Sequence, residues 1–295
     1  MNDLPQTEAR NPKTASLDEM RTVELVEVLA REQSDSVAAV VAVTDQLATA
    51  VDEISMRLSS GARLHYVGAG SSGRLGFLDA SEMPPTFGTD PSLVCAHIAG
   101  GREALTHAIE GAEDDGDAGE REMRGHVKSG DAVVGISASG GAPFVVRAVE
   151  TAREIGAWTL GVANNPGSPL GEAADLAIVL QTGPEPLTGS TRLKAGTSQK
   201  ILLNTLSTAT MVRLEKVYDN LMVDVVTSNI KLRKRALRLV MELVPADEAE
   251  AAKLLDAAQG LVKVAVVMGR KGLTAEEAGT VLESHGGSLR RAVAQ

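Results

Sequence analysis

The sequence predicts an α/β fold built around a five-stranded parallel sheet that helices cover on both faces. Between residues 63 and 180, short apolar runs alternate with glycine-rich turns and with segments of helical periodicity. The apolar runs are continuous, which is typical of strands that are buried on both faces of a parallel sheet. After residue 181 the strand pattern stops, and mainly helical segments follow.

The first part of the chain is expected to be helical. Residues 1–16 are polar, and we expect them to run as an extended arm. Ser16 and Glu19 have the spacing of a capping box, so a first helix is expected over 18–32. A stripe of valine and leucine predicts a second helix over 34–58.

The central part contains the strands and the helices between them. The expected strands are 63–67, 92–98, 131–136, 157–162 and 175–180. The expected helices are 72–82, 102–110, 117–128 and 143–156. Because proline lacks an N–H group and restricts the residue before it, Pro84-Pro85 is expected to end the first of these helices in a rigid corner.

The last third is expected to form helices. Helices are predicted over 193–216, 219–243 and 247–267, although the run 260–268 fits a strand equally well. A capping box at Thr274 and Glu277 and a Gly-Gly break at 286–287 predict two short helices in a small C-terminal bundle. We therefore expect three parts: an N-terminal arm with helices (1–60), a central domain (61–225) and a C-terminal helical region (226–295).

Composition and charge exclude several classes of function. The net charge is −10 and aromatic residues make up 2% of the chain, which disfavours nucleic-acid binding; the basic run at 231–238 is interpreted as the solvated face of a helix. No apolar run approaches the ~20 residues of a membrane span, and the N-terminus lacks the apolar region of a signal peptide. Cys95 is the single cysteine, and the five histidines show no paired ligand spacing. We expect a cytoplasmic protein without a metal site.

Two loops at strand ends are candidates for binding an anion. The first, GAGSSG, contains the G-x-G-x-x-G pattern at Gly68, Gly70 and Gly73, and the second is SASGGAP at 137–143. A dinucleotide site needs an acidic residue at the end of the second strand, but that strand ends in AHIAGG. Serine hydroxyls and N–H groups at a helix start favour a single phosphate. The alternative is that both loops are tight turns.

Two glutamates are candidates for acid–base catalysis. Glu82 follows the first loop, and Glu113 lies in the acidic stretch EGAEDDGD. Two carboxylates in different surroundings can divide into an acid and a base. The alternative is that both are solvated, and Asp114, Asp115 and Asp117 compete with Glu113 for the role.

The chain resembles the N-acetylmuramic acid 6-phosphate etherases of the sugar isomerase (SIS) superfamily. The matching stretches are TEARNPKTASLD, VGAGSSGRLGFLDASEMPPTFG, EGAEDD, GISASG, TGSTRLKAGTSQKILLNTLSTATMVRLEKVYDNLMVDV and GGSLRRA. The resemblance implies an SIS fold, an obligate homodimer, and no metal or other cofactor. It also implies a lyase that cleaves the lactyl ether of N-acetylmuramic acid 6-phosphate to N-acetylglucosamine 6-phosphate and D-lactate, in cell-wall recycling.

The resemblance also implies roles for individual residues. Glu82 corresponds to the proton donor, which should be desolvated to stay protonated, and Glu113 to the second catalytic residue. The residues corresponding to the phosphate loops are Ser71, Ser72, Ser137, Ser139 and Gly140. Two further candidates, which either bind the substrate's anionic groups or cap the loop and bridge subunits, are Arg192 and Lys194.

One departure and two rival functions accompany the resemblance. The family more often carries a larger polar pair where this chain has Gly141 and Ala142, so a threonine hydroxyl that could bind phosphate is missing. An aldose–ketose phosphate isomerase would share the base but not the acid. A regulator that senses sugar phosphates would use the same fold without turnover.

Overall fold

The computed structural model describes residues 5–225 and 230–294, and the chain forms two compact units. Unit 1 comprises Met1–Ala80 and Ser92–Thr208. Unit 2 comprises Ser81–Pro91 and Ala209–Gln295. Unit 1 contains the sheet, and unit 2 contains the C-terminal helices.

The five expected strands form one parallel sheet, which confirms the predicted fold class. The strands are β1 (Leu64–Gly68), β2 (Val94–Ile98), β3 (Ala132–Ser137), β4 (Trp158–Ala163) and β5 (Leu176–Val179), in the order β2-β1-β3-β4-β5. The chain passes from β1 to the edge strand β2 and then returns to β3 on the other side of β1. In open α/β sheets, ligands bind where the strand order reverses in this way, outside the carboxyl ends of the strands.

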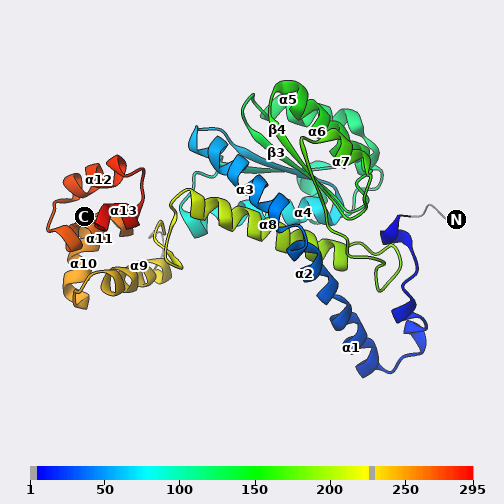
Figure 1. Cartoon of the computed structure of the whole chain (residues 1–295), viewed down its shortest axis with the longest axis horizontal. Helices are drawn as coiled ribbons and strands as arrows, with labels where there is room; N and C mark the ends of the chain where they lie inside the picture. Colours follow the sequence, from blue (N-terminus) through cyan, green and yellow to red (C-terminus); the bar gives the residue numbers. More distant parts are fainter. Residues whose placement is uncertain (1–4, 226–229, 295) are drawn as a thin grey trace. The chain divides into compact units, whose positions relative to one another are not determined.

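Helices cover both faces of the sheet. They are α3 (Thr44–Ser59), α4 (Gly70–Phe87), α5 (Gly116–His126), α6 (Pro143–Ile155), α7 (Pro169–Ala173) and α8 (Lys194–Arg213). Figure 1 shows α5, α6 and α7 on one side of the sheet and α3 and α8 on the other. Successive side chains of β1 point to opposite faces of the sheet. Val67 packs with residues of α5 and α6 on one face, and Tyr66 lies against Gly76 of α4 on the other.

The N-terminal segment differs from the sequence prediction. Its elements are the 3-10 turns η1 (Gln6–Glu8), η2 (Pro12–Thr14) and η3 (Leu17–Glu19), followed by α1 (Thr22–Glu32) and α2 (Ser34–Val41). The capping box expected at Ser16 is wrong, because Ser16 adopts φ 59° and its side chain makes no cap hydrogen bond. Instead Glu24 accepts the N–H of Arg21 where α1 begins. The expected helix 34–58 is divided, because Thr44 binds the carbonyl of Val41 and ends α2.

Two other expected elements need correction, and one helix was not expected. Helix α4 continues through Pro84 and Pro85 to Phe87, because the φ of proline suits a helix and the bond from Gly88 N–H to the Pro84 carbonyl still forms. The helix expected over 102–110 is only the 3-10 turn η4 (Gly101–Leu105). The short helix α7 was not predicted, since it is only five residues long.

The described part of unit 2 contains the ends of α4 and α8, a hairpin and five further helices. The hairpin strands and these five helices are β6 (Val217–Tyr218), β7 (Leu221–Met222), α9 (Ile230–Leu243), α10 (Glu248–Ala257), α11 (Val262–Lys271), α12 (Ala275–Ser284) and α13 (Leu289–Val293). The hairpin replaces the start of the helix expected over 219–243, because Asp219 at φ 55° begins a two-residue turn. Residues 226–229 of that expected helix lie outside the described residues.

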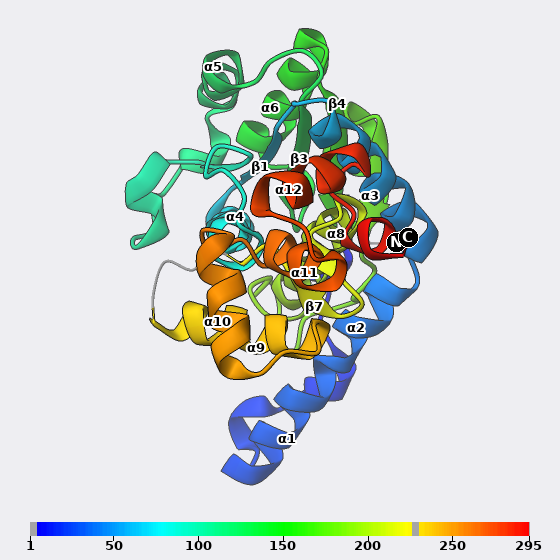
Figure 2. The ribbon, with the colours of Figure 1, turned by 90° about the vertical axis from the view of Figure 1, so that its left-hand side faces the viewer.

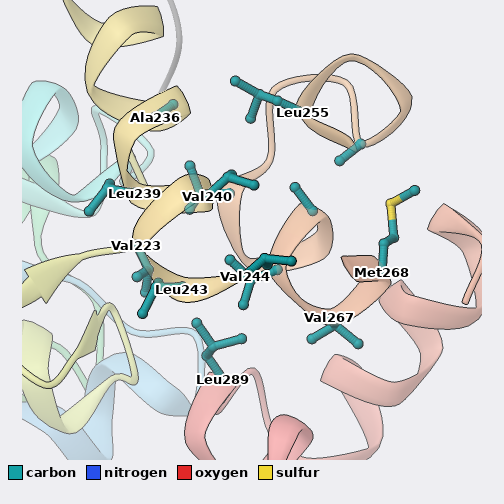
Figure 3. Packing of buried hydrophobic residues seen from close by; sticks show 14 of the residues in the cluster. Val223, Ala236, Leu239, Val240, Leu243, Val244, Leu255, Val267, Met268 and Leu289 are labelled. Atoms are coloured by element: carbon teal, nitrogen blue, oxygen red, sulfur yellow. The ribbon is translucent and has the colours of Figure 1, made fainter. Parts of the chain in front are cut away.

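The helices of unit 2 share one apolar core. Figure 2 shows α10, α11 and α12 beside one another. In Figure 3, side chains from α9, α11 and α13 converge, among them Leu243, Val267 and Leu289. The ambiguous run 260–268 is therefore helical from Val262 onward, and Val262, Val266 and Val267 lie in this core, whereas Leu261 is exposed. The capping box at Thr274 and Glu277 is confirmed by hydrogen bonds in both directions.

The basic run lies on the solvated face of α9, as predicted. Lys231, Arg233 and Lys234 are exposed, whereas Leu239 and Val240 are buried. Among the described residues, no helix combines the length and the apolar character that crossing a membrane requires.

A buried carboxyl group links three elements of unit 1. Asp79 of α4 is 6% exposed and accepts hydrogen bonds from the Tyr66 hydroxyl of β1 (2.9 Å) and the Ser207 hydroxyl of α8 (3.1 Å). Burial raises the pKa of Asp79 to about 6, against the hydrogen bonds, which lower it. The folded chain therefore holds a proton that the unfolded chain releases between pH 4 and pH 6.

We predict that Asp79→Asn removes a pH-dependent contribution to stability. Because the pKa of Asp79 is raised in the folded state, its contribution to the free energy of unfolding falls as the pH rises from about 4 to about 6. Roughly two pKa units correspond to at most about 3 kcal/mol. The free energy of unfolding is measured by urea denaturation. Its value for the variant minus its value for the wild type should rise from pH 4 to pH 6, because only the wild type loses this contribution. A difference that stays constant with pH would contradict the assignment.

Candidate functional site

The first strand-end loop is formed by a close contact between β1 and α4. A Cβ atom on Gly68 would lie 2.6 Å from the backbone nitrogen of Gly73, and one on Gly73 would lie 2.8 Å from the Gly68 carbonyl oxygen. These glycines are therefore needed for packing the helix start against the strand end. Ser71 and Ser72 consequently lie in the first turn of α4, where backbone N–H groups can bind an anion.

The Ser72 side chain belongs to a buried hydrogen-bond network. Its hydroxyl donates to the Gln199 side chain at 2.7 Å, and Gln199 donates to the Asn164 side chain at 3.0 Å. Asn164 in turn donates to the Leu180 carbonyl at 2.9 Å. Because the Ser72 proton is used in this network, a phosphate would meet the backbone N–H of Ser72 or the half-buried Ser71 rather than a Ser72 O–H.

The second strand-end loop holds its own turn together. The hydroxyl oxygen of Ser137 accepts the N–H of Gly140 at 3.1 Å, and that of Ser139 accepts the N–H of Gly141 at 3.2 Å. Gly140 adopts φ 71°, and a Cβ there would lie 2.3 Å from the Ser168 side chain. Both hydroxyls therefore stabilise the turn. Ser139 is exposed, so its O–H is also accessible to a ligand.

The two loops lie beside each other, and the segment of Glu113 lies close to the second. The loops follow neighbouring strands, since Gly68 pairs with Ile136 in the register of β1 and β3. The 3-10 turn η5 (Ala112–Asp114) carries Glu113 and packs against α6, the helix that follows the second loop. One apolar cluster connects the two loops and η5. It contains Ala142 of the second loop, and Ala69 of the first loop and Ala112 of η5 pack against it.

Of the acidic residues near Glu113, one has a structural role. Asp115 accepts the N–H of Ala118 at 2.9 Å as the N-cap of α5, and its carboxylate also lies 3.5 Å from Arg121. Glu113 itself is exposed at the surface of unit 1. Its carboxylate is therefore accessible to a ligand.

The surroundings of Glu82 differ from the expectation. Glu82 lies in the part of α4 that belongs to unit 2, and its side chain is exposed. The rigid corner expected at Pro84-Pro85 is replaced by a further turn of α4. The desolvated position that the sequence analysis expects for Glu82 is thus not provided within the single chain.

Arg192 and Lys194 have different environments. Lys194 is 1% exposed, and its ammonium group lies 2.9 Å from Asp35 and 3.3 Å from Glu32. This pairing favours the structural role for Lys194, which fixes the start of α8 to α1 and α2. Arg192 is exposed and is therefore the more accessible of the two cations.

Glu185 is a positioning residue that sequence reasoning missed. It is fully buried and accepts the N–H groups of Lys194 (2.8 Å) and Ala195 (2.9 Å) at the first turn of α8. Burial raises the pKa of this carboxyl group. No local pattern indicates the role, because Glu185 lies outside the capping positions next to the helix.

The structure also gathers histidines that the sequence analysis left unpaired. His97 of β2 contacts the Glu122 carboxylate at 2.7 Å and His65 of β1 at 3.0 Å, and His126 lies next to Glu122 on α5. Burial, together with His97, lowers the pKa of His65 to about 4. Ligand atoms of His97, Glu122 and His126 thus lie within 4.8 Å of one another, although the histidines show no paired spacing in the sequence. Glu122 and His126 stand four residues apart, a spacing visible in the predicted helix, but only the fold adds His97.

Comparison with known proteins gives relatives along the whole chain. The sequence is 48% identical to an N-acetylmuramic acid 6-phosphate etherase of Deinococcus radiodurans, over 100% of this chain and 97% of the relative. It is 50% identical to an N-acetylmuramic acid 6-phosphate etherase of Symbiobacterium thermophilum, over 88% of this chain and 87% of the relative.

Family models and solved structures agree on the fold of the central part. Residues 46–153 match the glucokinase regulatory protein N-terminal SIS domain, and residues 112–209 match the SIS domain. The fold is similar to that of a phosphoheptose isomerase from Francisella tularensis, with a TM-score of 0.52 and 15% identity over 65% of this chain and 98% of that chain. At this identity the likeness concerns the fold alone.

We predict that Gln199→Leu destabilises unit 1. The substitution leaves the buried Ser72 hydroxyl and the Asn164 side-chain oxygen without their partner, at a cost of about 1–3 kcal/mol for each unsatisfied group. Thermal unfolding should shift to a lower temperature. Thr205→Ala, an exposed change on the same helix, is the control and should leave the transition almost unchanged. Equal transitions for Gln199→Leu and wild type would show that the network adds no stability.

Proposed function

We propose that this chain, which belongs to the N-acetylmuramic acid 6-phosphate etherase family, cleaves the lactyl ether of N-acetylmuramic acid 6-phosphate. The products are N-acetylglucosamine 6-phosphate and D-lactate, and the reaction serves the recycling of cell-wall sugars. The observation that carries the proposal is the near-complete alignment with etherases at 44–50% identity. This alignment favours the etherase over the isomerase and the regulator.

The reaction needs a base and an acid. In the open-chain sugar, the aldehyde at carbon 1 acidifies the proton on carbon 2. A carboxylate removes that proton, and the electron pair enters the carbonyl group as an enolate. The enolate then expels the lactyl oxygen from carbon 3, and a carboxylic acid protonates this poor leaving group. Water adds to carbon 3 of the unsaturated aldehyde, and carbon 2 is protonated again. Each proton-transfer group contributes a factor of ~10²–10⁴.

We assign the base to Glu113 and the acid to Glu82. The assignment rests on the family match at EGAEDD and LDASEMPP. The packing of η5, which carries Glu113, against α6, the helix that follows the second strand-end loop, supports it for Glu113. Since Glu82 is exposed in the single chain, the bound sugar or a second subunit has to shield it so that it stays protonated.

The phosphate of the sugar is assigned to the two strand-end loops. The reversal of strand order between β1 and β3 supports this position. The first loop offers Ser71 and backbone N–H groups, and the second offers the accessible hydroxyl of Ser139. Arg192 is the candidate for a further contact to an anionic group of the substrate. Binding of a remote phosphate orients the reacting carbons and contributes to the rate.

We also propose that the chain acts as a homodimer in the cytoplasm. The N-terminal helices leave apolar side chains exposed, and the exposed fractions are 64% for Val23, 61% for Val26, 53% for Val37 and 66% for Val41. Figure 1 shows that α1 extends away from the sheet of unit 1. A second subunit would bury these side chains. The single cysteine suits a reducing compartment.

Incubation of the full chain with N-acetylmuramic acid 6-phosphate tests the function. Release of D-lactate, measured with a coupled lactate assay, is the expected result. Interconversion of aldose and ketose phosphates without lactate would indicate the isomerase, and binding without turnover would indicate the regulator.

We predict that a proton-exchange experiment distinguishes the base from the acid. If Glu113 is the base, Glu82→Ala should still exchange the carbon 2 proton of N-acetylglucosamine 6-phosphate with deuterium from the solvent, because enolisation needs no acid at carbon 3. Lactate release by this variant should fall by about 10²–10⁴. Glu113→Ala should lose both exchange and lactate release.

The control for this experiment is Glu110→Gln, an exposed change shortly before Glu113, which should keep both activities. Exchange is followed by NMR of the product sugar. Exchange at the wild-type rate in Glu113→Ala, together with its loss in Glu82→Ala, would reverse the two roles. Free exchange in both variants would make Asp114 the first candidate for the base.

We predict that Ser139→Ala raises the KM for the phosphorylated sugar. The loss of one hydrogen bond to a charged group costs roughly 1.5–3 kcal/mol, which corresponds to a KM about ten- to a hundred-fold higher. Ser129→Ala, an exposed serine before β3 at the opposite end of the strand, is the control. An unchanged KM in steady-state kinetics of Ser139→Ala would show that the second loop is only a turn.

A further inference from the structure

A line of four titratable side chains crosses unit 1 from β1 to α5. Asp131 lies 3.3 Å from His65 Nε2, His65 Nδ1 lies 3.0 Å from His97 Nε2, and His97 Nδ1 lies 2.7 Å from Glu122 Oε1. His65 and His97 are buried, and their rings stack with centroids 5.3 Å apart. They face α5 because they occupy alternate positions of two paired strands.

With both imidazoles neutral, the line has three contacts but only two ring N–H groups to fill them. Each of the three contacts needs a hydrogen between its two atoms, and each neutral imidazole carries one N–H group. One contact must therefore lack a hydrogen. The longest contact, between His65 and Asp131, is the one that lacks it, and His65 Nε2 is a buried atom without a hydrogen-bond partner.

A cation between His97 and Glu122 would satisfy all three contacts. If His97 Nδ1 binds a cation, its proton moves to Nε2 and is donated to His65 Nδ1. The proton of His65 then moves to Nε2 and is donated to Asp131, whose other partners are backbone N–H groups and Arg63. Metal-binding histidines commonly donate their second N–H to such a partner, which fixes the tautomer of the ring.

His126 is the third candidate ligand, next to His97 and Glu122. His126 Nδ1 lies 3.6 Å from a carboxylate oxygen of Glu122 and 2.9 Å from the Glu122 carbonyl, so a rotation of the imidazole brings a ring nitrogen to an ion beside that carboxylate. One ligand atom each from His97, Glu122 and His126 lies within 4.8 Å of the other two. A tetrahedral zinc ion, bound at about 2.0–2.1 Å, holds its ligand atoms roughly 3.4 Å apart, so small side-chain rotations suffice.

We propose that His97, Glu122 and His126 form a binding site for a divalent transition-metal ion, with zinc as the best fit. Two imidazoles and a carboxylate suit zinc, and three protein ligands leave a fourth tetrahedral position. The three residues line a cavity of about 610 Å³, so a water molecule or a small anion can take that position. Cys95 lines the same cavity and stands two residues before His97 on the strand.

The site would tie the edge strand β2 to the last turn of α5. His126 is the last residue of α5, and Glu122 lies one turn before it. The etherase reaction proposed above needs no metal, so the site goes beyond that function and its test is independent of activity. The bound ion would hold the last turn of α5 against β2. The first residue of α5, Gly116, closely follows the turn η5 that carries Glu113.

Zinc titration of the full chain tests the site. After treatment with a chelator and dialysis, zinc chloride is added in competition with a colorimetric zinc indicator, and we expect one ion per chain. Glu122→Gln and His126→Ala should each weaken binding by at least about tenfold. Both positions are at least partly exposed, so the variants should keep the fold, as circular dichroism can check.

The controls are His107→Ala, an exposed histidine outside the cluster, and Cys95→Ser, which removes the neighbouring thiol. Both should bind zinc as the wild type does. Absence of stoichiometric binding in the wild type, or unchanged binding in Glu122→Gln and His126→Ala, would overturn the proposal. Loss of binding in Cys95→Ser would also overturn it, because the thiol would then be a ligand in place of the set proposed here.

NMR of the histidine side chains gives a second readout. In the ¹⁵N-labelled chain, zinc should move the proton of His65 from Nδ1 to Nε2, which changes the nitrogen chemical shifts of that ring. An ion bound elsewhere on the surface would leave the His65 tautomer as it is, and this outcome would refute the coupling between the metal and the buried rings.

Discussion

The close contact between Gly68 and Gly73 is the constraint on which the rest of unit 1 depends. It lets β1 pass directly into α4, with Ser71 and Ser72 in the first turn of the helix. Any side chain at either glycine would move the start of α4 away from the strand end. The glycine pattern therefore has a packing function first, and the exposed backbone N–H groups of the loop are a consequence of it.

Buried polar contacts then fix α4 and α8 on the sheet. The network from Ser72 through Gln199 to Asn164 joins the start of α4 to the end of β4, and Asp79 joins the middle of α4 to β1 and α8. Such contacts have directions that apolar packing lacks, so they define one position for each helix. A rigid first turn suits an anion site, because no ordering cost has to be met when the ligand binds.

The groups assigned to chemistry are the exposed ones. Glu82, Glu113, Ser139 and Arg192 all lie at the surface of the chain, whereas Lys194, Glu185 and Ser72 are buried and partnered. This division suggests a rigid polar scaffold that carries accessible reacting groups. The substrate and a second subunit then have to exclude water from the carboxyl groups, since desolvation favours the protonated form that an acid catalyst needs. The histidine cluster would add a tie between β2 and the last turn of α5, the helix that begins just after the turn of Glu113.

The sequence by itself determined the strands of the parallel sheet, the sheet class, the strand-end loops and the family, because each depends on local patterns or on long matching stretches. It failed where distant residues meet. Lys194 lies in the stretch TGSTRLKAG that resembles the etherases, yet its partners Glu32 and Asp35 lie on helices far away in the chain. Pro84 and Pro85 do not end α4, because the bonds of the final turn compensate locally. His97 joins Glu122 only because β2 lies next to β1 beneath α5. Burial and proton sharing are properties of neighbours in space, so only the tertiary structure decided them.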